Sequence, residues 1–171
     1  MAKSRKRPLV QAPPSTQRSH ADHSSKTKAS GRRTRLYLRF SEAHAKLDTR
    51  ALHLLYAPGA TYLPRAGRFD IQTREKILER EKASHDAMRM NGGSIRLSFR
   101  VTDRKRFGDV VVDNGYMRSV IRRSKDEPAN TSTSKFILVM ARQPDGRWAL
   151  VSDADSDALA EAYDTSSHVR Q

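Results

Sequence analysis

Apolar and polar residues alternate in the second half of the chain. From Ile95 to Val101 every second residue is apolar, which predicts a half-buried β-strand. We expect residues 103–108 to form a solvated basic turn, followed by a longer strand over residues 109–123. Gly115 lies inside that strand and predicts a bulge or bend, because glycine weakens regular pairing.

The last strands form a predicted hairpin. Asp145-Gly146 separates two β-rich runs, and glycine adopts the positive φ of a tight turn without steric cost. Residues 135–142 and 147–153 are therefore expected to pair as antiparallel strands. Trp148 follows the turn and is expected to anchor the sheet by packing across it.

The preceding segment has helical periodicity. Apolar residues recur every three or four positions over residues 41–56, which predicts a helix that ends at Pro58-Gly59. A short strand is expected over 60–63, and a second helix over 73–90 with Thr73 as its N-cap. Helices followed by consecutive strands indicate an α+β domain, in which a strongly curved antiparallel sheet wraps the N-terminal helices.

Charge divides the chain unevenly. Residues 1–40 hold eleven Lys and Arg and one acidic residue, so they carry most of the formal net charge of +14. Few apolar residues occur before residue 36, so this segment cannot bury enough surface to offset its ordering entropy. We predict a disordered basic tail over 1–35, a folded domain over 36–155 and a polar C-terminal extension over 156–171 that frays.

The tail has two interpretations. Its basic clusters over 3–7 and 32–39 could neutralise phosphates and bind nucleic acid, although no aromatic residue precedes Tyr37 to stack on bases. The alternative is a solvated appendage. The start is also Arg- and Ser-rich like an organellar transit peptide, but it lacks an apolar face. The chain has no cysteine and no apolar run long enough to span a membrane, so we expect a cytoplasmic protein without a membrane partner.

Several motifs resemble one known superfamily. They are Leu-Leu-Tyr-Ala-Pro-Gly-Ala-Thr-Tyr-Leu-Pro at 54–64, Arg-Glu-Lys-Ile at 74–77, Gly115-Tyr116, Lys135-Phe136 and Asp-Gly-Arg-Trp at 145–148. Their order over residues 41–155 resembles the nuclear-transport-factor-2-like superfamily, in particular its SnoaL-like and steroid-isomerase-like domains. The resemblance implies a cone-shaped, cystatin-like fold with a pocket at its open end, often paired into homodimers. It does not imply one chemistry, because this cone hosts isomerases, dehydratases, cyclases and inactive modules.

The catalytic residue of the steroid isomerases is not found in this chain. In those enzymes a carboxylate precedes the proline that closes the first short strand, and here Leu63 holds that position. Asp70 and His85 are the remaining catalytic candidates. An aspartate before a helix, such as Asp70, is more often a solvated loop or capping residue, and a single helical histidine such as His85 is more often a surface residue.

Aromatic residues suit a ligand pocket better. Tyr56, Tyr62, Tyr116 and Trp148 are the ligand-binding candidates, since aromatic rings with one polar atom can line a cavity and orient a ligand. The alternative is that all four are core residues. The six histidines are scattered without a carboxylate at ligand spacing, so the sequence predicts no metal site, and no motif predicts a cofactor.

The resemblance, together with the tyrosines near the expected mouth, implies a SnoaL-like domain that binds a small, mostly apolar molecule in the cone pocket. Acid/base turnover of that molecule, as in an isomerase, dehydratase or cyclase, is compatible with this interpretation, but the sequence does not decide whether the protein is an enzyme. The alternative is a non-catalytic module for dimerisation or protein contact, with weak nucleic-acid binding by the tail. We expect a homodimer, because the strand over 109–123 carries apolar residues on both faces.

Overall fold

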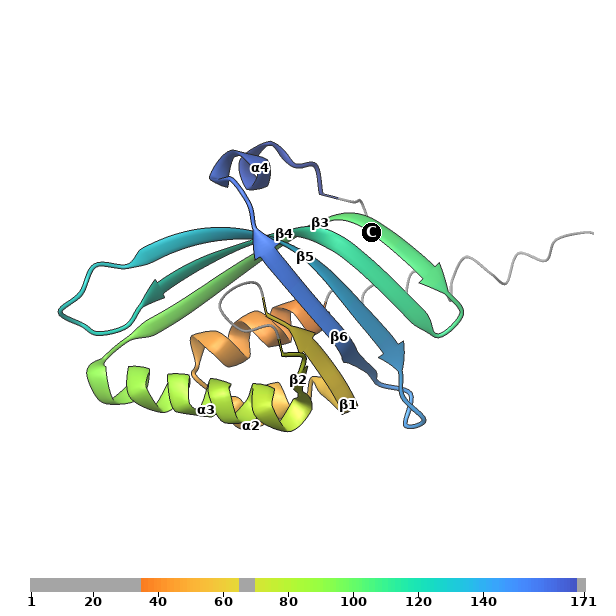
Figure 1. The fold of residues 1–171 in the computed structure, drawn as a ribbon, viewed down its shortest axis with the longest axis horizontal. Coiled ribbons are helices and arrows are strands. Elements are labelled where there is room, and N and C mark those ends of the chain that lie inside the picture. Colours follow the sequence, from red (N-terminus) through yellow and green to blue (C-terminus); the bar gives the residue numbers. More distant parts are fainter. Residues whose placement is uncertain (1–34, 65–69, 169–171) are drawn as a thin grey trace, which may run out of the picture.

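The computed structural model describes residues 35–64 and 70–168, so the predicted tail over 1–35 lies almost wholly outside the described residues. One curved sheet curls over helices that lie against its inner face (Figure 1). The elements in chain order are a helix over 35–45, α2 (Thr49–His53), β1 (Tyr56–Leu63), β2 (Gln72–Thr73), α3 (Arg74–Asn91), β3 (Ser94–Phe107), β4 (Val110–Arg122), β5 (Asn130–Arg142), β6 (Trp148–Asp157) and α4 (Ala160–Thr165).

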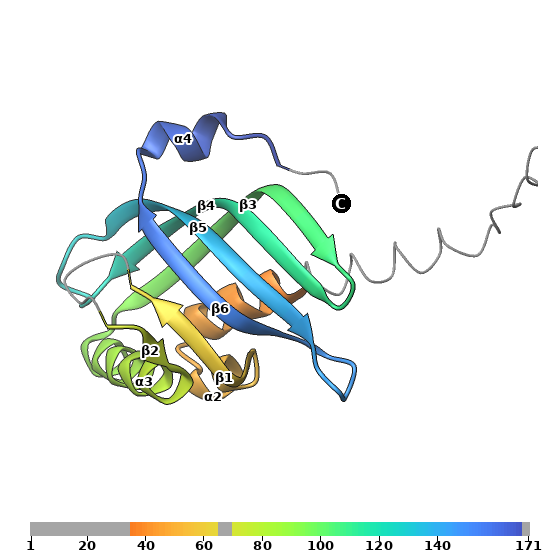
Figure 2. The same cartoon turned by 45° about the vertical axis from the view of Figure 1, so that its right-hand side comes forward.

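The sheet has the strand order β2-β1-β6-β5-β4-β3. Strands β3 to β6 are antiparallel neighbours, which confirms the predicted meander. The sheet is mixed rather than wholly antiparallel, because β1 pairs parallel to β6 (Figure 2). Parallel strands need a long connection, and here β2, α3 and strands β3 to β5 lie between β1 and β6 in the chain.

The helix expected over 41–56 is two helices. The first runs over 35–45, and the break follows at Leu47, whose φ of 54° is left-handed. Asp48 then caps α2 by accepting a hydrogen bond from the Ala51 N–H at 2.9 Å. Strand β1 begins at Tyr56, four residues earlier than expected, and its irregular register with β6 accommodates Pro58-Gly59.

The second predicted helix is confirmed within one residue. Helix α3 spans Arg74–Asn91 with Thr73 at the N-cap position, and Gly92 ends it with a left-handed φ of 65°. The Thr73 side chain makes no capping hydrogen bond, so the position was predicted correctly but its mechanism was not.

The prediction of a basic turn over residues 103–108 is wrong, because β3 continues to Phe107. Arg104 is not solvated: its Nε and Nη2 donate to the two carboxylate oxygens of Asp113 at 2.7 and 2.6 Å. Asp113 is fully buried and also accepts from the Tyr37 hydroxyl at 2.8 Å. The turn itself is only Gly108-Asp109.

Gly115 marks a bulge, as the sequence indicated, but the extra residue lies in the neighbouring strand. The register of β3 shifts between Val101 and Asp103, opposite Gly115 and Asn114. A Cβ atom at Gly115 would lie 2.1 Å from the backbone oxygen of Arg100. Glycine is therefore required because two backbones approach each other.

The C-terminal segment differs from the fraying end that we expected. Strand β6 continues to Asp157, and α4 lies against the outer face of the sheet (Figure 2). Tyr163 is buried between the guanidinium groups of Arg100 and Arg118, which lie 4.6 and 4.3 Å from its ring centroid. Arg100 also donates to three backbone carbonyls of this segment. None of the described helices combines the length and hydropathy needed to cross a membrane.

Candidate active site

A cavity of about 340 Å³ lies between the helices and the concave face of the sheet. This volume is within the range of about 300–1,000 Å³ typical of small-molecule sites. Most of its wall is aliphatic or aromatic, with rings from the first helix and from β1, β3 and β5. Its polar and titratable lining residues are Tyr37, His44, Tyr56, Tyr62, Arg80, Glu81, Ser84, Ser119, Ser132, Asp153 and Asp155.

Strand β6 directs two carboxylates into this cavity. Asp153 and Asp155 are two residues apart and so project from the same face. Sheet register places Asp153 between Tyr62 of β1 and Leu138 of β5, and Asp155 beside Phe136. Both acids are thus set among aromatic and aliphatic neighbours.

Asp153 has a strongly perturbed acidity. Loss of water around the carboxyl group, with a further contribution from the charge of Asp155, raises the pKa of Asp153 from 3.8 to about 7. Among the described residues, no side chain forms a hydrogen bond with the Asp153 carboxyl group, whereas Asp155 accepts one from the Tyr62 hydroxyl at 2.7 Å. Asp153 can therefore exchange a proton near neutral pH.

The tyrosines of the cavity remain protonated. Burial raises the pKa of the Tyr56 hydroxyl well above its usual value. Burial, together with the hydrogen bond to Asp155, raises that of Tyr62. The Arg80 guanidinium lies 4.8 Å from the centroid of the Tyr62 ring and donates to Gln72 Oε1 at 2.7 Å. The Tyr62 hydroxyl is thus already engaged with Asp155, whereas the neutral Tyr56 hydroxyl can donate a hydrogen bond to a ligand oxygen.

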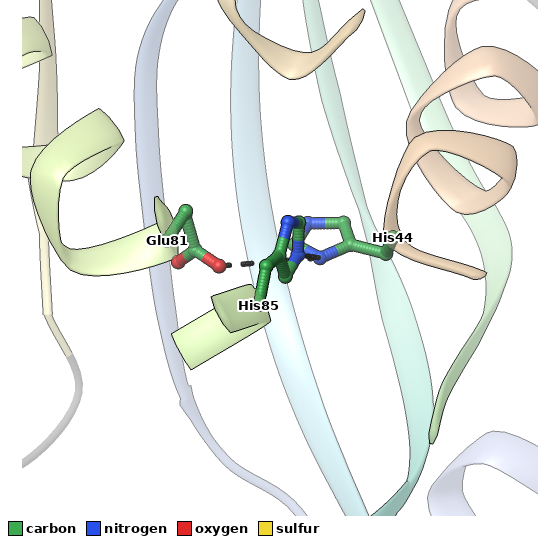
Figure 3. Close-up of side chains that lie close together, drawn as sticks. All are labelled: His44, Glu81 and His85. Atoms are coloured by element: carbon green, nitrogen blue, oxygen red, sulfur yellow. Dashed lines mark hydrogen bonds and ion pairs between the residues drawn. The ribbon is translucent and has the colours of Figure 1, made fainter. Parts of the chain in front are cut away.

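A second polar cluster lies where the helix over 35–45 meets α3 (Figure 3). His85 Nε2 is 3.2 Å from His44 Nδ1, which is 4.0 Å from Glu81 Oε2. The two imidazoles are perpendicular, and His85 Nδ1 lies 3.0 Å from the Thr49 hydroxyl oxygen. Burial lowers the pKa of His44 from 6.5 to about 4 and also lowers that of His85, so both rings are neutral at pH 7.

The structure divides the four aromatic residues that the sequence nominated for ligand binding into two that line the cavity and two that do not. Tyr56 and Tyr62 line the cavity, and their contact with a ligand stays a prediction. Tyr116 does not line it, because the even-numbered residues of β4 point to the outer face. Trp148 packs against the core near the hairpin end and lines a separate hollow with Leu36 and Arg147.

The two catalytic candidates also lie outside the cavity lining. Asp70 is exposed before β2. His85 is fully buried behind the cavity wall, where it contacts His44, so the expected surface position is wrong. Sequence reasoning missed Asp153 and the histidine pair. The alternation along β6 could have indicated the inward face of Asp153. Glu81 lies four positions before His85 on one face of α3, so the expectation that no carboxylate stands at ligand spacing from a histidine is wrong. No local signal, however, relates His44 to His85.

Comparisons with known proteins support the architecture. No protein-family model matches the chain, and no curated protein is a significant match. Solved structures with similar folds include an NTF2-like protein with a cystatin-like fold from Novosphingobium aromaticivorans, with a TM-score of 0.63 and 19% identity over 84% of this chain and 96% of that one. A candidate dehydratase of the NTF2-like family from Streptomyces avermitilis has a TM-score of 0.66 and 16% identity, over 78% of this chain and 99% of that one.

A third similar structure, of a protein from Catenulispora acidiphila, was solved in complex with S-DNPA. Its TM-score is 0.64 at 16% identity, over 77% of this chain and 94% of that one. The described chain therefore has the nuclear-transport-factor-2-like, cystatin-like fold, which is a cone-shaped α+β domain. This fold hosts unrelated activities, so the function has to be argued from the cavity.

Proposed function

We propose that the protein binds a small, mostly apolar molecule in the cavity and transfers a proton to or from it through Asp153. One observation carries this proposal: a carboxyl group with a pKa of about 7 lines an apolar cavity of ligand size. A general acid or base is most effective when its pKa is close to the working pH. Asp153 thus has both the position and the pKa that a proton-transfer residue in this cavity needs.

A tyrosine hydroxyl in the cavity indicates that the ligand carries an oxygen atom that accepts a hydrogen bond. Tyr56 keeps its proton and can donate it to an oxygen atom, such as that of a carbonyl group, whereas the Tyr62 hydroxyl already donates to Asp155. Charge that develops on that oxygen would be stabilised by such a donor. Isomerisation or dehydration next to a carbonyl fits this arrangement, and similar structures include a candidate dehydratase and a protein that binds S-DNPA.

A thermal-shift screen with small hydrophobic ketones and hydroxyketones tests binding, because a ligand that binds only the native state raises Tm by mass action. NMR in D₂O then tests proton transfer, by following deuterium incorporation into a ligand that binds. Asp153→Asn should abolish this exchange and retain binding. Asp126→Asn, an identical change at an exposed loop position, should alter neither. Absence of binding across the screen, or exchange that survives in Asp153→Asn, would refute the proposal.

The second candidate function is a non-catalytic module that associates through the outer face of the sheet. Val112 pairs with Val139 there, and Ile137 is 42% exposed, so this face carries apolar surface. A second copy of the chain would cover it. Light scattering at tens of micromolar should then give a dimer mass that Ile137→Asp reduces to that of the monomer. A monomeric wild type would exclude this candidate.

A further inference from the structure

The His44, Glu81 and His85 cluster brings three metal-binding side chains together on two packed helices. Glu81 and His85 are four residues apart on α3 and therefore share one face of that helix. His44 approaches from the helix over 35–45 (Figure 3). One ligand atom from each residue can be chosen so that all three lie within 4.8 Å of one another.

We propose that these three residues bind one divalent transition-metal ion of the zinc type. Two imidazole nitrogens bound to the same tetrahedral ion at about 2.0–2.1 Å lie roughly 3.3 Å apart. His44 Nδ1 and His85 Nε2 are already 3.2 Å apart. Glu81 Oε2 is 4.0 Å from His44 Nδ1, so its carboxylate has to approach by roughly 1 Å to complete the set.

The residue types select the class of metal. Imidazole nitrogen suits zinc, iron, copper and nickel, whereas magnesium and calcium prefer sites made wholly of oxygen. Two histidines and one carboxylate are a known zinc ligand set that keeps a further coordination position open. The cluster therefore favours zinc over magnesium or calcium.

Thr49 orients one of the ligands. Its hydroxyl oxygen is 3.0 Å from His85 Nδ1. When His85 donates its Nδ1–H to this oxygen, the lone pair of Nε2 faces His44 and is available to a metal ion. Polar partners of this kind fix the tautomer and orientation of a metal-binding histidine. The competing interpretation is a metal-free hydrogen bond between two neutral imidazoles.

The open position of the ion would face the ligand cavity. His44 and Glu81 line the cavity, whereas His85 is behind them. An ion held there could bind water or a ligand oxygen and polarise it as a Lewis acid. Metal binding involves neither Asp153 nor a substrate, so it can be tested independently of the proposed function.

The test is calorimetric titration of the full-length chain, freed of metal by chelation, with Zn²⁺. His20 and His23 could bind zinc adventitiously, so a variant with both replaced by alanine is the reference protein. We expect one Zn²⁺ per chain in this reference. Glu81→Gln should weaken binding by more than about 10-fold and Thr49→Val by about 10-fold, the lower end of the effect of an outer-shell partner.

Glu79→Gln is the matched control, since it makes the same change at an exposed position of α3 and should leave zinc affinity unchanged. Circular dichroism of each metal-free variant establishes that it is folded. Co²⁺ provides a second readout through visible ligand-field bands, which His44→Gln should alter. Absence of stoichiometric zinc binding, or equal affinity in the Glu81→Gln and Glu79→Gln variants, would overturn the proposal.

Discussion

Asp153→Asn should stabilise the folded protein, and more strongly as pH rises. The pKa of Asp153 is raised in the folded state, so the native protein favours the protonated form. Wild-type protein therefore loses stability between about pH 4 and pH 7, when this group must ionise inside the cavity. Asparagine keeps a similar shape and cannot ionise, so the variant avoids that loss.

The magnitude follows from the shift in pKa. A rise from 3.8 to about 7, at about 1.4 kcal/mol per pKa unit, corresponds to an upper value of about 4 kcal/mol. Asp153 is only part-buried and lines a cavity that water can enter. We therefore expect a gain of about 2 kcal/mol for Asp153→Asn above pH 7, and nearly none at pH 4.

Urea unfolding of wild type, Asp153→Asn and Asp126→Asn from pH 4 to pH 8.5 measures this gain. The difference between Asp153→Asn and wild type cancels the contribution of titrating residues remote from the cavity, because they are common to both proteins, and reports Asp153 together with its coupling to Asp155. Asp126→Asn is the matched control and should change stability by less than about 0.5 kcal/mol, since this exposed aspartate has no hydrogen bond or ion pair from its side chain among the described residues. A flat difference for Asp153→Asn, or destabilisation at pH 8, would refute the raised pKa and remove the observation behind the proposed function.

Three further changes test the fold and the tail. Gly115→Ala should destabilise the protein by about 3 kcal/mol or more in chemical denaturation, because its Cβ would meet the Arg100 backbone oxygen at 2.1 Å; a loss below about 1 kcal/mol would contradict this close approach. Trp148→Ala should cost about 2 kcal/mol, less than the 3–5 kcal/mol typical of a fully buried tryptophan, and an unchanged urea midpoint would show that its packing contributes nothing. Deleting residues 1–34 should change stability by less than about 0.5 kcal/mol. If the tail binds nucleic acid, the deletion should also remove retardation of duplex DNA at low salt; retardation that persists would assign the binding to the folded domain.

Local sequence patterns alone are sufficient to predict much of this fold. The alternation from Ile95 onwards predicted β3, and the Asp145-Gly146 turn predicted the final hairpin. Helix α3 begins after Thr73, as predicted, and ends within one residue of the expected position. These features depend on the conformational preferences of short segments, which the sequence encodes directly. The order of the motifs along the chain, through its resemblance to a known superfamily, predicted the cone-shaped fold with its curved sheet.

The candidate site required the tertiary structure. His44 and His85 are 41 positions apart and meet only because two helices pack together. Asp153 has an ordinary sequence context, and its raised pKa arises from lost water and from Asp155 in the assembled cavity. Likewise, the sequence predicted that Arg104 lies in a solvated turn, but the pairing of β3 with β4 places it in an ion pair with buried Asp113. Acidity and coordination depend on distance and on water exclusion, and both quantities exist only once remote segments are packed against each other.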